Sequence, residues 1–195
     1  FVIDKKPCVL KETVLKVENL VVGSSKKGKN SVNNVSFEVK GGEIVCIAGI
    51  DGNGQSELAY CLTGLEKAKS GKILFNNVDV TSSNIKTKNK LGLGHIPEDR
   101  HKFGLVLDFT LENNLILKKF DNERFNKFGF IKNDSIREYA DTLIEQFDIR
   151  SPLGATNMAR TMSGGNQQKA IIAREIDLDP KLLVAVQPTR GLDVG

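Results

Sequence analysis

The alternation of apolar and polar positions divides the first part of the chain into strands, a loop and a helix. Residues 14–22 and 32–39 alternate apolar with polar side chains across a short loop, which predicts an antiparallel strand pair. Residues 43–48 are almost wholly apolar between glycines, as in a strand buried on both faces. Apolar positions at helical spacing predict a helix over residues 56–65.

The second part of the chain is richer in helical periodicity. Further strands are predicted over residues 72–80 and 92–96, followed by a polar turn over residues 97–102. Apolar spacing predicts three helices, over residues 110–118, 134–147 and 165–176. The apolar run 181–186 stops before Pro188 and predicts another fully buried strand. This order favours an α/β core with a helical subdomain at about residues 100–175.

Composition is that of an ordinary globular domain. The 195 residues are 39% hydrophobic and 27% charged, which is enough apolar material for one core, and no run is long enough to span a membrane. The basic N-terminus lacks the apolar run of a signal peptide. Cys8, Cys46 and Cys61 show no CxxC or zinc spacing, which fits a reducing cytoplasm.

The net charge of +4 and pI of about 8.9 raise the question of nucleic-acid binding. The lysines are scattered, however, and the densest group, over residues 24–30, is a Gly/Ser/Lys loop. No aromatic platform for stacking bases accompanies them. We therefore expect no nucleic-acid partner.

The segment from residue 49 to residue 57 lies where a phosphate-binding loop belongs, between the predicted buried strand and a helix. In the pattern GxxxxGK[ST], glycines let backbone N–H groups wrap phosphates at a helix N-terminus. Gly49, Gly54 and Ser56 match this pattern, but Gln55 stands at the lysine position. The candidate nucleotide-binding residues are Gly49, Asp51, Gly52, Asn53, Gly54, Gln55, Ser56 and Glu57.

The missing lysine predicts a weak phosphate site. Lysine normally reaches the β- and γ-phosphates, so a neutral Gln55 weakens both binding and chemistry. Asp51 and Glu57 add negative charge beside the anion, and Ser56 is at most a weak Mg²⁺ ligand. The alternative for this segment taken alone is a tight packing turn.

Ser163, Gly164, Gly165, Asn166 and Gln167 begin the sequence SGGNQQK. This segment resembles the LSGGQ signature of ATP-binding cassettes, in the variant of sugar and nucleoside importers. The hydroxyl and glycine amides at a helix N-terminus suit a γ-phosphate that a partner domain presents. The alternative is that Ser163 only caps the helix.

Residues 182–193 resemble the family's Walker B strand and D-loop, where LLDEPT is usual. The Asp that supports Mg²⁺ is replaced by Val186, and the Glu that polarises the attacking water is replaced by Gln187. No catalytic residue is therefore expected to be intact. Asp193 stands at the D-loop aspartate that meets the opposite domain.

Glu98 lies where the family has the glutamine of its Q-loop, the link to the membrane subunits. An exposed charged turn is the alternative interpretation of this segment. His95 and His101 are expected to be loop residues rather than metal ligands. Residues 20–23 offer no aromatic side chain to stack on adenine, so adenine is expected to be held loosely.

The resemblance covers residues 14–195 and is nearest to the C-terminal cassette of tandem importer ATPases for nucleosides or simple sugars. It implies a P-loop NTPase-type α/β core with an antiparallel β subdomain and a helical, signature-bearing subdomain. Residues 1–12 would be a linker from a first cassette and residues 13–195 the second. The chain ends before the family's switch histidine, so a fragment is expected.

In this family two cassettes close head to tail, each ATP lying between the phosphate loop of one and the signature of the other. The resemblance implies ATP and Mg²⁺ as cofactors, and as partners a first cassette, transmembrane permease subunits and, indirectly, a substrate-binding lipoprotein. The expected place is the cytoplasmic face of the membrane. Here the signature would complete the first cassette's site.

The alternative functions are an ordinary hydrolysing cassette and a soluble cassette protein acting on DNA or the ribosome.

Overall fold

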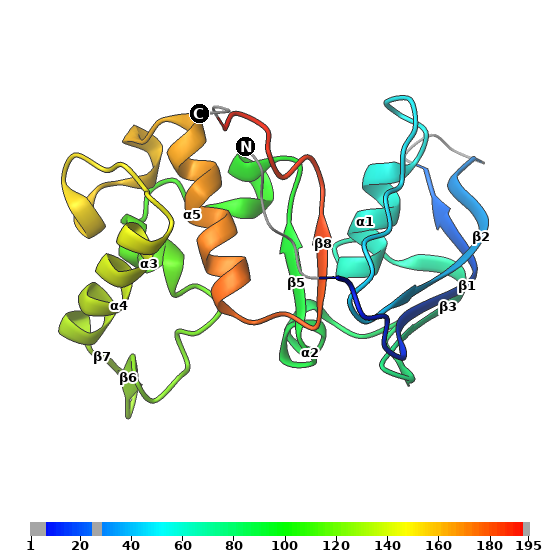
Figure 1. Ribbon diagram of the computed structural model, residues 1–195, viewed down its shortest axis with the longest axis horizontal. Helices are drawn as coiled ribbons and strands as arrows, with labels where there is room; N and C mark the ends of the chain where they lie inside the picture. Colours follow the sequence, from blue (N-terminus) through cyan, green and yellow to red (C-terminus); the bar gives the residue numbers. More distant parts are fainter. Residues whose placement is uncertain (1–6, 25–28, 193–195) are drawn as a thin grey trace. The chain divides into compact units, whose positions relative to one another are not determined.

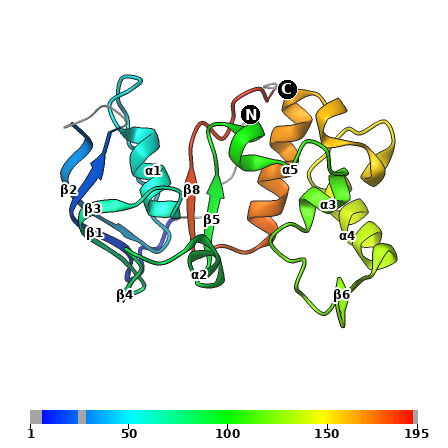
Figure 2. The ribbon, with the colours of Figure 1, turned by 180° about the vertical axis from the view of Figure 1, so that it is seen from behind.

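The computed structural model describes residues 7–24 and 29–192, and the chain divides into two compact units, Phe1–Leu93 and Gly94–Gly195. Each unit has its own secondary structure (Figures 1 and 2). The phosphate loop belongs to the first unit. The Q-loop, signature and Walker B segments all belong to the second.

The first unit is built on an antiparallel sheet with the strand order β2-β1-β3-β4. Its strands are β1 (Thr13–Gly23), β2 (Asn30–Lys40), β3 (Ala68–Phe75) and β4 (Val78–Asp79). Val17 of β1 is 1% exposed and pairs with Phe37 on one side and Ile73 on the other. The predicted strand pair is therefore confirmed, and helices α1 (Gln55–Thr63) and α2 (Ile85–Lys90) complete the unit.

Residues 72–80, predicted as one strand, are wrongly assigned in part. The chain turns back at Asn76 and Asn77, whose φ angles are 48° and 63°, so that Phe75 pairs with Val78 across a tight hairpin. Asparagine tolerates the left-handed conformation that such a turn needs at both central positions. Alternation alone did not reveal this turn.

Residues 43–48, predicted as a buried strand, form no strand in the described chain, and that prediction is wrong. The segment is exposed along its whole length, with Ile44 96% exposed and Ile47 50% exposed. A strand exists through its hydrogen bonds to a neighbour, and the four-stranded sheet of this unit does not include this segment. An apolar sequence favours pairing with another strand, but it does not determine which strand that is.

The second unit contains a small sheet and a group of helices. The sheet pairs β5 (Leu93–Ile96) with β8 (Leu182–Ala185). The helices are α3 (Leu111–Leu115), α4 (Asn133–Gln146) and α5 (Gly164–Asp177), with short helical turns η1 (Arg100–Gly104), η2 (Gly154–Thr156) and η3 (Ala159–Thr161). A hairpin of β6 (Asn126–Lys127) and β7 (Phe130–Ile131), missed by the sequence reasoning, lies between α3 and α4.

Strand β8 is shorter and more exposed than predicted. Its residues alternate between half-buried and exposed, and Leu183 is 37% exposed, so the expectation of full burial is wrong. In its two-stranded sheet β8 has one neighbour, β5, which leaves its other edge outside the ladder. Full burial needs packing on both faces and both edges.

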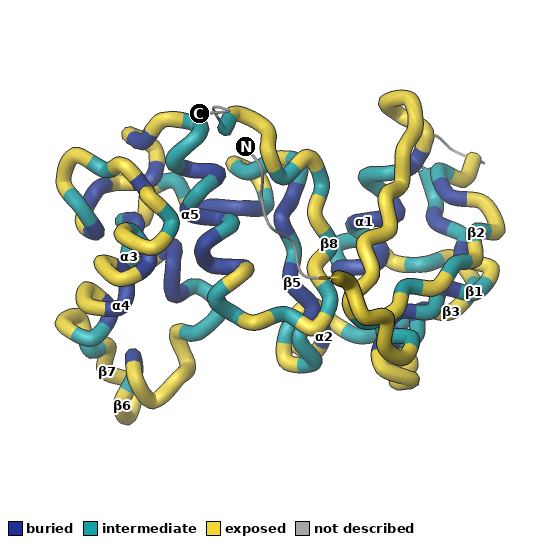
Figure 3. The backbone as a smooth tube through the Cα atoms, viewed as in Figure 1, coloured by how far each residue is buried: buried dark blue, intermediate teal, exposed yellow. Residues whose placement is uncertain are grey.

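The core of the second unit lies among the three helices (Figure 3). Helix α4 turns one stripe inward, with Ile136, Tyr139, Ala140 and Leu143 at spacings of three and four residues. Helix α5 contributes Ala170 and Ala173, whose small side chains allow close approach. The predicted helices over residues 134–147 and 165–176 are confirmed to within a residue.

Candidate functional site

The phosphate loop is a tight turn that leads directly into α1. Gly54 precedes the helix with φ 97°, and no side chain caps the helix N-terminus. A Cβ on Gly54 would lie 2.1 Å from the Ser31 carbonyl oxygen, so only glycine fits there. Gly52, at φ 82°, has open space around it instead. The first N–H groups of α1 thus have no capping side chain, as an anion site requires.

Gln55, at the position where lysine is expected, folds back over its own loop. Its Nε2 donates to the Ile50 carbonyl at 3.2 Å, and a Cβ on Gly49 would lie 1.9 Å from that same nitrogen. The side chain therefore supplies a neutral amide that closes the loop rather than a cation for a phosphate. Glu57 in the first turn of α1 accepts from the Ser31 hydroxyl at 3.1 Å.

Two carboxylate side chains belong to this loop and to the first turn of α1. Asp51 is exposed and Glu57 is half-buried, while Asn53 closes the turn by donating its backbone N–H to Ile50. Ser56 follows Gln55 at the second helical position. A carboxylate in the first turn satisfies the helix dipole by itself and so competes with a bound phosphate.

The signature segment begins α5, a helix of 14 residues. Ser163 caps this helix, since its Oγ accepts from the Asn166 backbone N–H at 3.4 Å and the Asn166 amide at 2.9 Å. A Cβ on Gly165 would lie 2.7 Å from the Gly191 carbonyl oxygen, which brings the D-loop segment onto the helix. Ser163 therefore caps the helix through the Asn166 N–H. The backbone N–H groups of Gly164 and Gly165 are not used by this cap.

Gln167 supports the signature from inside and does not lie on its surface. It is 4% exposed, and its Nε2 donates to the Ala159 carbonyl at 2.9 Å. Its Oε1 lies 2.9 Å from His101 Nε2 on the turn that follows the Q-loop. Of the five predicted signature residues, Gln167 is thus the one that this conformation turns inward.

The Q-loop and Walker B positions meet directly. Gln187 Nε2 donates to Glu98 Oε1 at 3.4 Å, and Gln187 has the left-handed φ of 48°. Val186 donates its backbone N–H to Ile96 at 2.9 Å, which ends the β5–β8 pairing at this point. An amide and a carboxylate therefore face each other where the family has its own glutamine and glutamate. Asp193 lies outside the described residues.

Arg100 connects these segments and was missed by the sequence reasoning. Its Nη1 donates to the Arg190 carbonyl oxygen at 3.4 Å, and a Cβ on Gly164 would lie 2.7 Å from its Nη2. One guanidinium thus lies against both the signature glycine and the D-loop. No local pattern marks this role, because its partners are separated from it by more than sixty residues. The turn that carries it is fixed by Asp99, which accepts from the His101 N–H at 3.0 Å.

A buried ionic cluster lies behind the Q-loop strand. Glu175 of α5 is fully buried and accepts from Lys118 Nζ at 2.6 Å, Arg174 Nε at 3.0 Å and the His95 backbone N–H at 3.0 Å. Burial alone would raise the pKa of Glu175, but the charges of Lys118 and Arg174 outweigh it and lower that pKa. The carboxylate is therefore ionised and ties α5 to β5.

His95 belongs to strand β5 and not to a loop, which corrects the sequence expectation. Burial, together with the nearby Lys118 charge, lowers its pKa to about 4, so its ring is neutral at neutral pH. Its Nε2 is buried without a hydrogen-bond partner. His101 lies on η1, and no cluster of three metal-ligating side chains occurs within the described residues.

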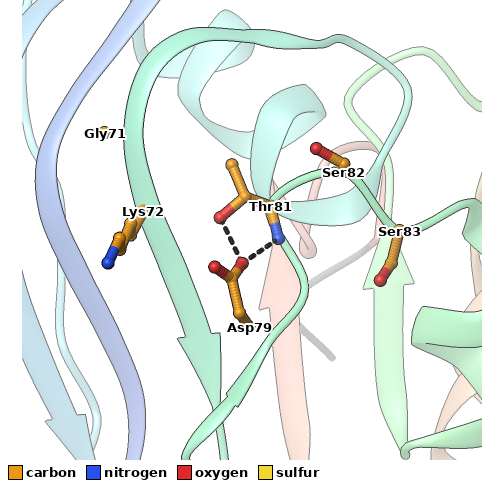
Figure 4. Close-up of a pocket in the computed structure, with 6 residues that line it drawn as sticks. All are labelled: Gly71, Lys72, Asp79, Thr81, Ser82 and Ser83. Atoms are coloured by element: carbon orange, nitrogen blue, oxygen red, sulfur yellow. Dashed lines mark hydrogen bonds between the residues drawn. The ribbon is translucent and has the colours of Figure 1, made fainter.

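A shallow hollow of about 530 Å³ in the first unit is lined by residues of β3, β4 and the turn after β4, and by none of the predicted site residues. Figure 4 shows Asp79 accepting from both the backbone N–H and the hydroxyl of Thr81, at 2.9 and 2.6 Å. These bonds lower the pKa of Asp79 and hold the turn after β4. The hollow is therefore a feature of this turn and carries no chemistry of its own.

Across the part of the chain that the structure describes, no helix is both long and apolar enough to cross a membrane.

Comparison with known sequences gives one consistent result. The profile of the family described as ABC transporter matches residues 32–190. The chain is 45% identical over 195 residues to the nucleoside import ATP-binding protein of Lactococcus lactis, covering 100% of this chain and 38% of that protein. It is 47% identical over 182 residues to the guanosine import ATP-binding protein of Bacillus subtilis, covering 93% and 35%. The chain thus spans little more than a third of these relatives.

Solved structures agree on the fold. A dimeric bacterial ABC transporter cassette superposes with a TM-score of 0.75 at 24% identity, covering 92% of this chain and 76% of that chain. A nucleotide-free ATP-binding cassette gives 0.73 at 23% identity, covering 93% and 71%. The predicted fold class, an α/β P-loop NTPase-type core with an antiparallel sheet and a helical part, is confirmed.

Proposed function

Because the chain belongs to the ABC transporter family, we propose that it is the second nucleotide-binding cassette of an importer for nucleosides or simple sugars. In this role its own phosphate site is weak or inactive, and its signature completes the site of a first cassette. The relatives that it matches include a nucleoside import and a guanosine import ATP-binding protein, which supports the substrate class.

The observation that carries this proposal is an asymmetry between two motifs. Hydrolysis of ATP needs a cation on the β- and γ-phosphates, a carboxylate for Mg²⁺ and a group that orients water. At these three positions the chain has Gln55, Val186 and Gln187, and none of them supplies a charge. The Gln55 amide, moreover, is bound to the Ile50 carbonyl within its own loop.

The signature, in contrast, keeps everything that its role requires. A γ-phosphate presented by a partner needs only a hydroxyl and backbone N–H groups at a helix N-terminus. Ser163, Gly164 and Gly165 provide these at the start of α5, and the Gly191 carbonyl leaves no room for a larger residue at Gly165. The proposed partners are therefore the first cassette and the permease subunits at the cytoplasmic face of the membrane, with ATP and Mg²⁺ shared between the cassettes.

The second candidate is an ordinary hydrolysing cassette in which Gln55 and Gln187 are tolerated. The contact between Gln187 and Glu98 gives it some support, because a carboxylate is still present near the Walker B position. A cassette protein that acts on nucleic acid has no comparable support, since the lysines are scattered and no stacking platform accompanies them.

The two candidates differ in which residue matters for transport. In the complete transporter, replacing Ser163 with alanine should lower ATP hydrolysis roughly a hundredfold, by analogy with the loss of a phosphate-facing donor. Replacing Gln187 with alanine should change hydrolysis little. If Gln187→Ala stopped hydrolysis and Ser163→Ala left it intact, this chain would be the hydrolysing cassette.

A matched control separates phosphate binding from helix capping. Thr110 caps α3 as Ser163 caps α5, each accepting a backbone N–H at 3.4 Å. Both alanine variants should lose about 1 kcal/mol of stability, but Thr110→Ala should retain hydrolysis and uptake. Titration of the chain with ATP should give weak binding that changes little when Mg²⁺ is removed, because no carboxylate is left at Val186 to hold the ion.

A further inference from the structure

The β6–β7 hairpin lies between α3 and α4 in the second unit (Figures 1 and 2), and its apolar side chains are exposed. Phe128 is 91% exposed, Phe130 79% and Ile131 51%, whereas Phe125 at the base of the hairpin is 2% exposed. Figure 3 shows the hairpin as an exposed tip on a buried base. Phe125 belongs to the core of this unit, whereas the exposed side chains at the tip add no buried apolar contact to that core.

The tip residue is also held in an unfavourable backbone conformation. Lys127 pairs with Phe130, which leaves Phe128 and Gly129 as a two-residue turn with φ angles of 53° and 88°. Asparagine and glycine are the usual residues of such a turn, and a bulky side chain is strained in the left-handed region. Residues held in this region cluster at functional sites.

The hairpin is anchored firmly despite its exposure. Asn126 Oδ1 accepts the Gly129 N–H at 2.9 Å, and Lys132 donates its backbone N–H to Phe125 at 2.9 Å. The Phe125 ring packs on Tyr139 with centroids 5.0 Å apart. These contacts fix the backbone of the hairpin that carries the two exposed rings.

The tip itself carries a positive charge. Within the hairpin, residues 126–131, Lys127 is the charged residue, whereas the Lys132 ammonium beside it donates to the Glu123 carbonyl at 2.7 Å. Lys127 Nζ lies 5.9 Å from the centre of the Phe128 ring, so cation and aromatic ring are presented together. Aromatic side chains flanked by lysines match the boundary between anionic headgroups and acyl chains.

We propose that this hairpin docks on the surface of an anionic bilayer, with Phe128 and Phe130 entering the headgroup boundary and Lys127 contacting lipid phosphates. The size of the tip favours a membrane over a protein partner. A stable protein interface needs roughly 800 Å² on each side, whereas a few apolar side chains with adjacent basic residues suffice to hold a protein at a lipid interface. The hairpin is thus a second attachment to the membrane, separate from the nucleotide site.

The chain has no tryptophan, which allows a single reporter. In Phe128→Trp, adding vesicles of phosphatidylcholine and phosphatidylserine should shift the emission to shorter wavelength, and vesicles of phosphatidylcholine alone should shift it less. Leu153 is 70% exposed elsewhere in the same unit, so Leu153→Trp is the matched control and should show no shift. Equal spectra for Phe128→Trp with and without anionic vesicles would overturn the proposal.

Co-sedimentation of the full chain with the same vesicles measures the contribution of each group. Phe128→Ser should weaken binding on the order of tenfold, and Lys127→Gln should weaken it about fivefold. Leu153→Ser should bind as the unaltered chain does. If Phe128→Ser bound vesicles normally but failed to assemble with the permease subunits, the tip would be a protein contact and the proposal wrong. ATP hydrolysis, which tests the proposed function, does not enter either vesicle measurement.

Discussion

Restoring a glutamate at the Walker B position should destabilise the fold unless the Q-loop changes with it. Gln187 Nε2 now donates to Glu98 Oε1 at 3.4 Å. In Gln187→Glu two carboxylates would occupy this contact, and the amide donor would be lost. The single reversion is therefore expected to be unfavourable, even though it recreates the family's residue.

The size of the effect follows from the distance. Two unit charges 3.4 Å apart repel by about 1 kcal/mol in water and about 5 kcal/mol at an effective dielectric constant of about 20. Gln187 is exposed and Glu98 half-buried, so the lower value applies. The lost hydrogen bond to a charged group adds roughly 1 kcal/mol. We expect Gln187→Glu to lose about 2 kcal/mol of unfolding free energy at pH 7.

The pH dependence gives the sign of the effect. Repulsion raises the pKa of the carboxyl introduced by Gln187→Glu above the value of about 4.3 for an unfolded glutamate. The loss of stability is therefore full above the raised pKa and fades as the pH falls toward 4, where a shared proton restores a donor. Urea unfolding at several pH values measures this, and the double variant Gln187→Glu/Glu98→Gln should regain the stability at pH 7.

Two results would refute this reasoning. One is a single variant as stable as the unaltered chain at every pH, and the other is a double variant no more stable than the single one. Hydrolysis is a separate matter, because Gln55 and Val186 remain unchanged in both variants. We expect neither variant to hydrolyse ATP at its own loop.

The remaining predictions concern the buried cluster of the second unit. Glu175→Ala leaves the Lys118 and Arg174 charges without their carboxylate and should cost about 3–5 kcal/mol in urea unfolding, whereas Glu138→Ala on the exposed side of α4 should change stability by no more than about 0.5 kcal/mol. The pKa of His95, lowered to about 4 in the fold, predicts a stability loss of roughly 3 kcal/mol as the pH falls from 6.5 to 4, because the unfolded chain takes up the proton first. His95→Gln should flatten that slope, and an unchanged slope would show that another group titrates.

The sequence predicted those elements whose signal is local and long. The helix over residues 134–147 was found at Asn133–Gln146 because four turns of regular apolar spacing average out single exceptions. The start of α5 was found because Ser163 is a capping residue at the right place. Residues 43–48 went wrong because an apolar run does not say which strand it pairs with.

Short elements were missed for a different reason. The β6–β7 hairpin has strands of two residues and a Phe-Gly turn, where Asn-Gly would have been recognisable. Residues 72–80 were predicted as one strand because the apolar positions on both sides of Asn76 and Asn77 fit one alternating pattern. The two asparagines in fact form the turn of a hairpin. In both cases the turn chemistry carried the information, and the strands were too short to carry periodicity.

For the candidate site, motif spacing predicted positions but not directions. It placed Gln55 and Gln167 in the phosphate loop and the signature, yet one side chain folds back on its own loop and the other points into the core. Arg100 could not be found at all, because its partners lie far along the chain at Gly164 and Arg190. Side-chain direction depends on neighbours brought together by folding, which no local pattern records.

The proposed division of labour explains why losses are concentrated in one kind of residue. A lysine that binds the phosphates and a carboxylate that binds Mg²⁺ depend on each other, because Mg²⁺ itself bridges the phosphates. Each group therefore acts on the same bound MgATP. When either charged group is absent, the other contributes less to binding MgATP. Neutral residues at all three positions, Gln55, Val186 and Gln187, are consistent with this dependence. The signature depends on no such charge. In the proposed role it needs only backbone N–H groups and one hydroxyl at a helix N-terminus, so that role would not depend on the phosphate site of its own chain.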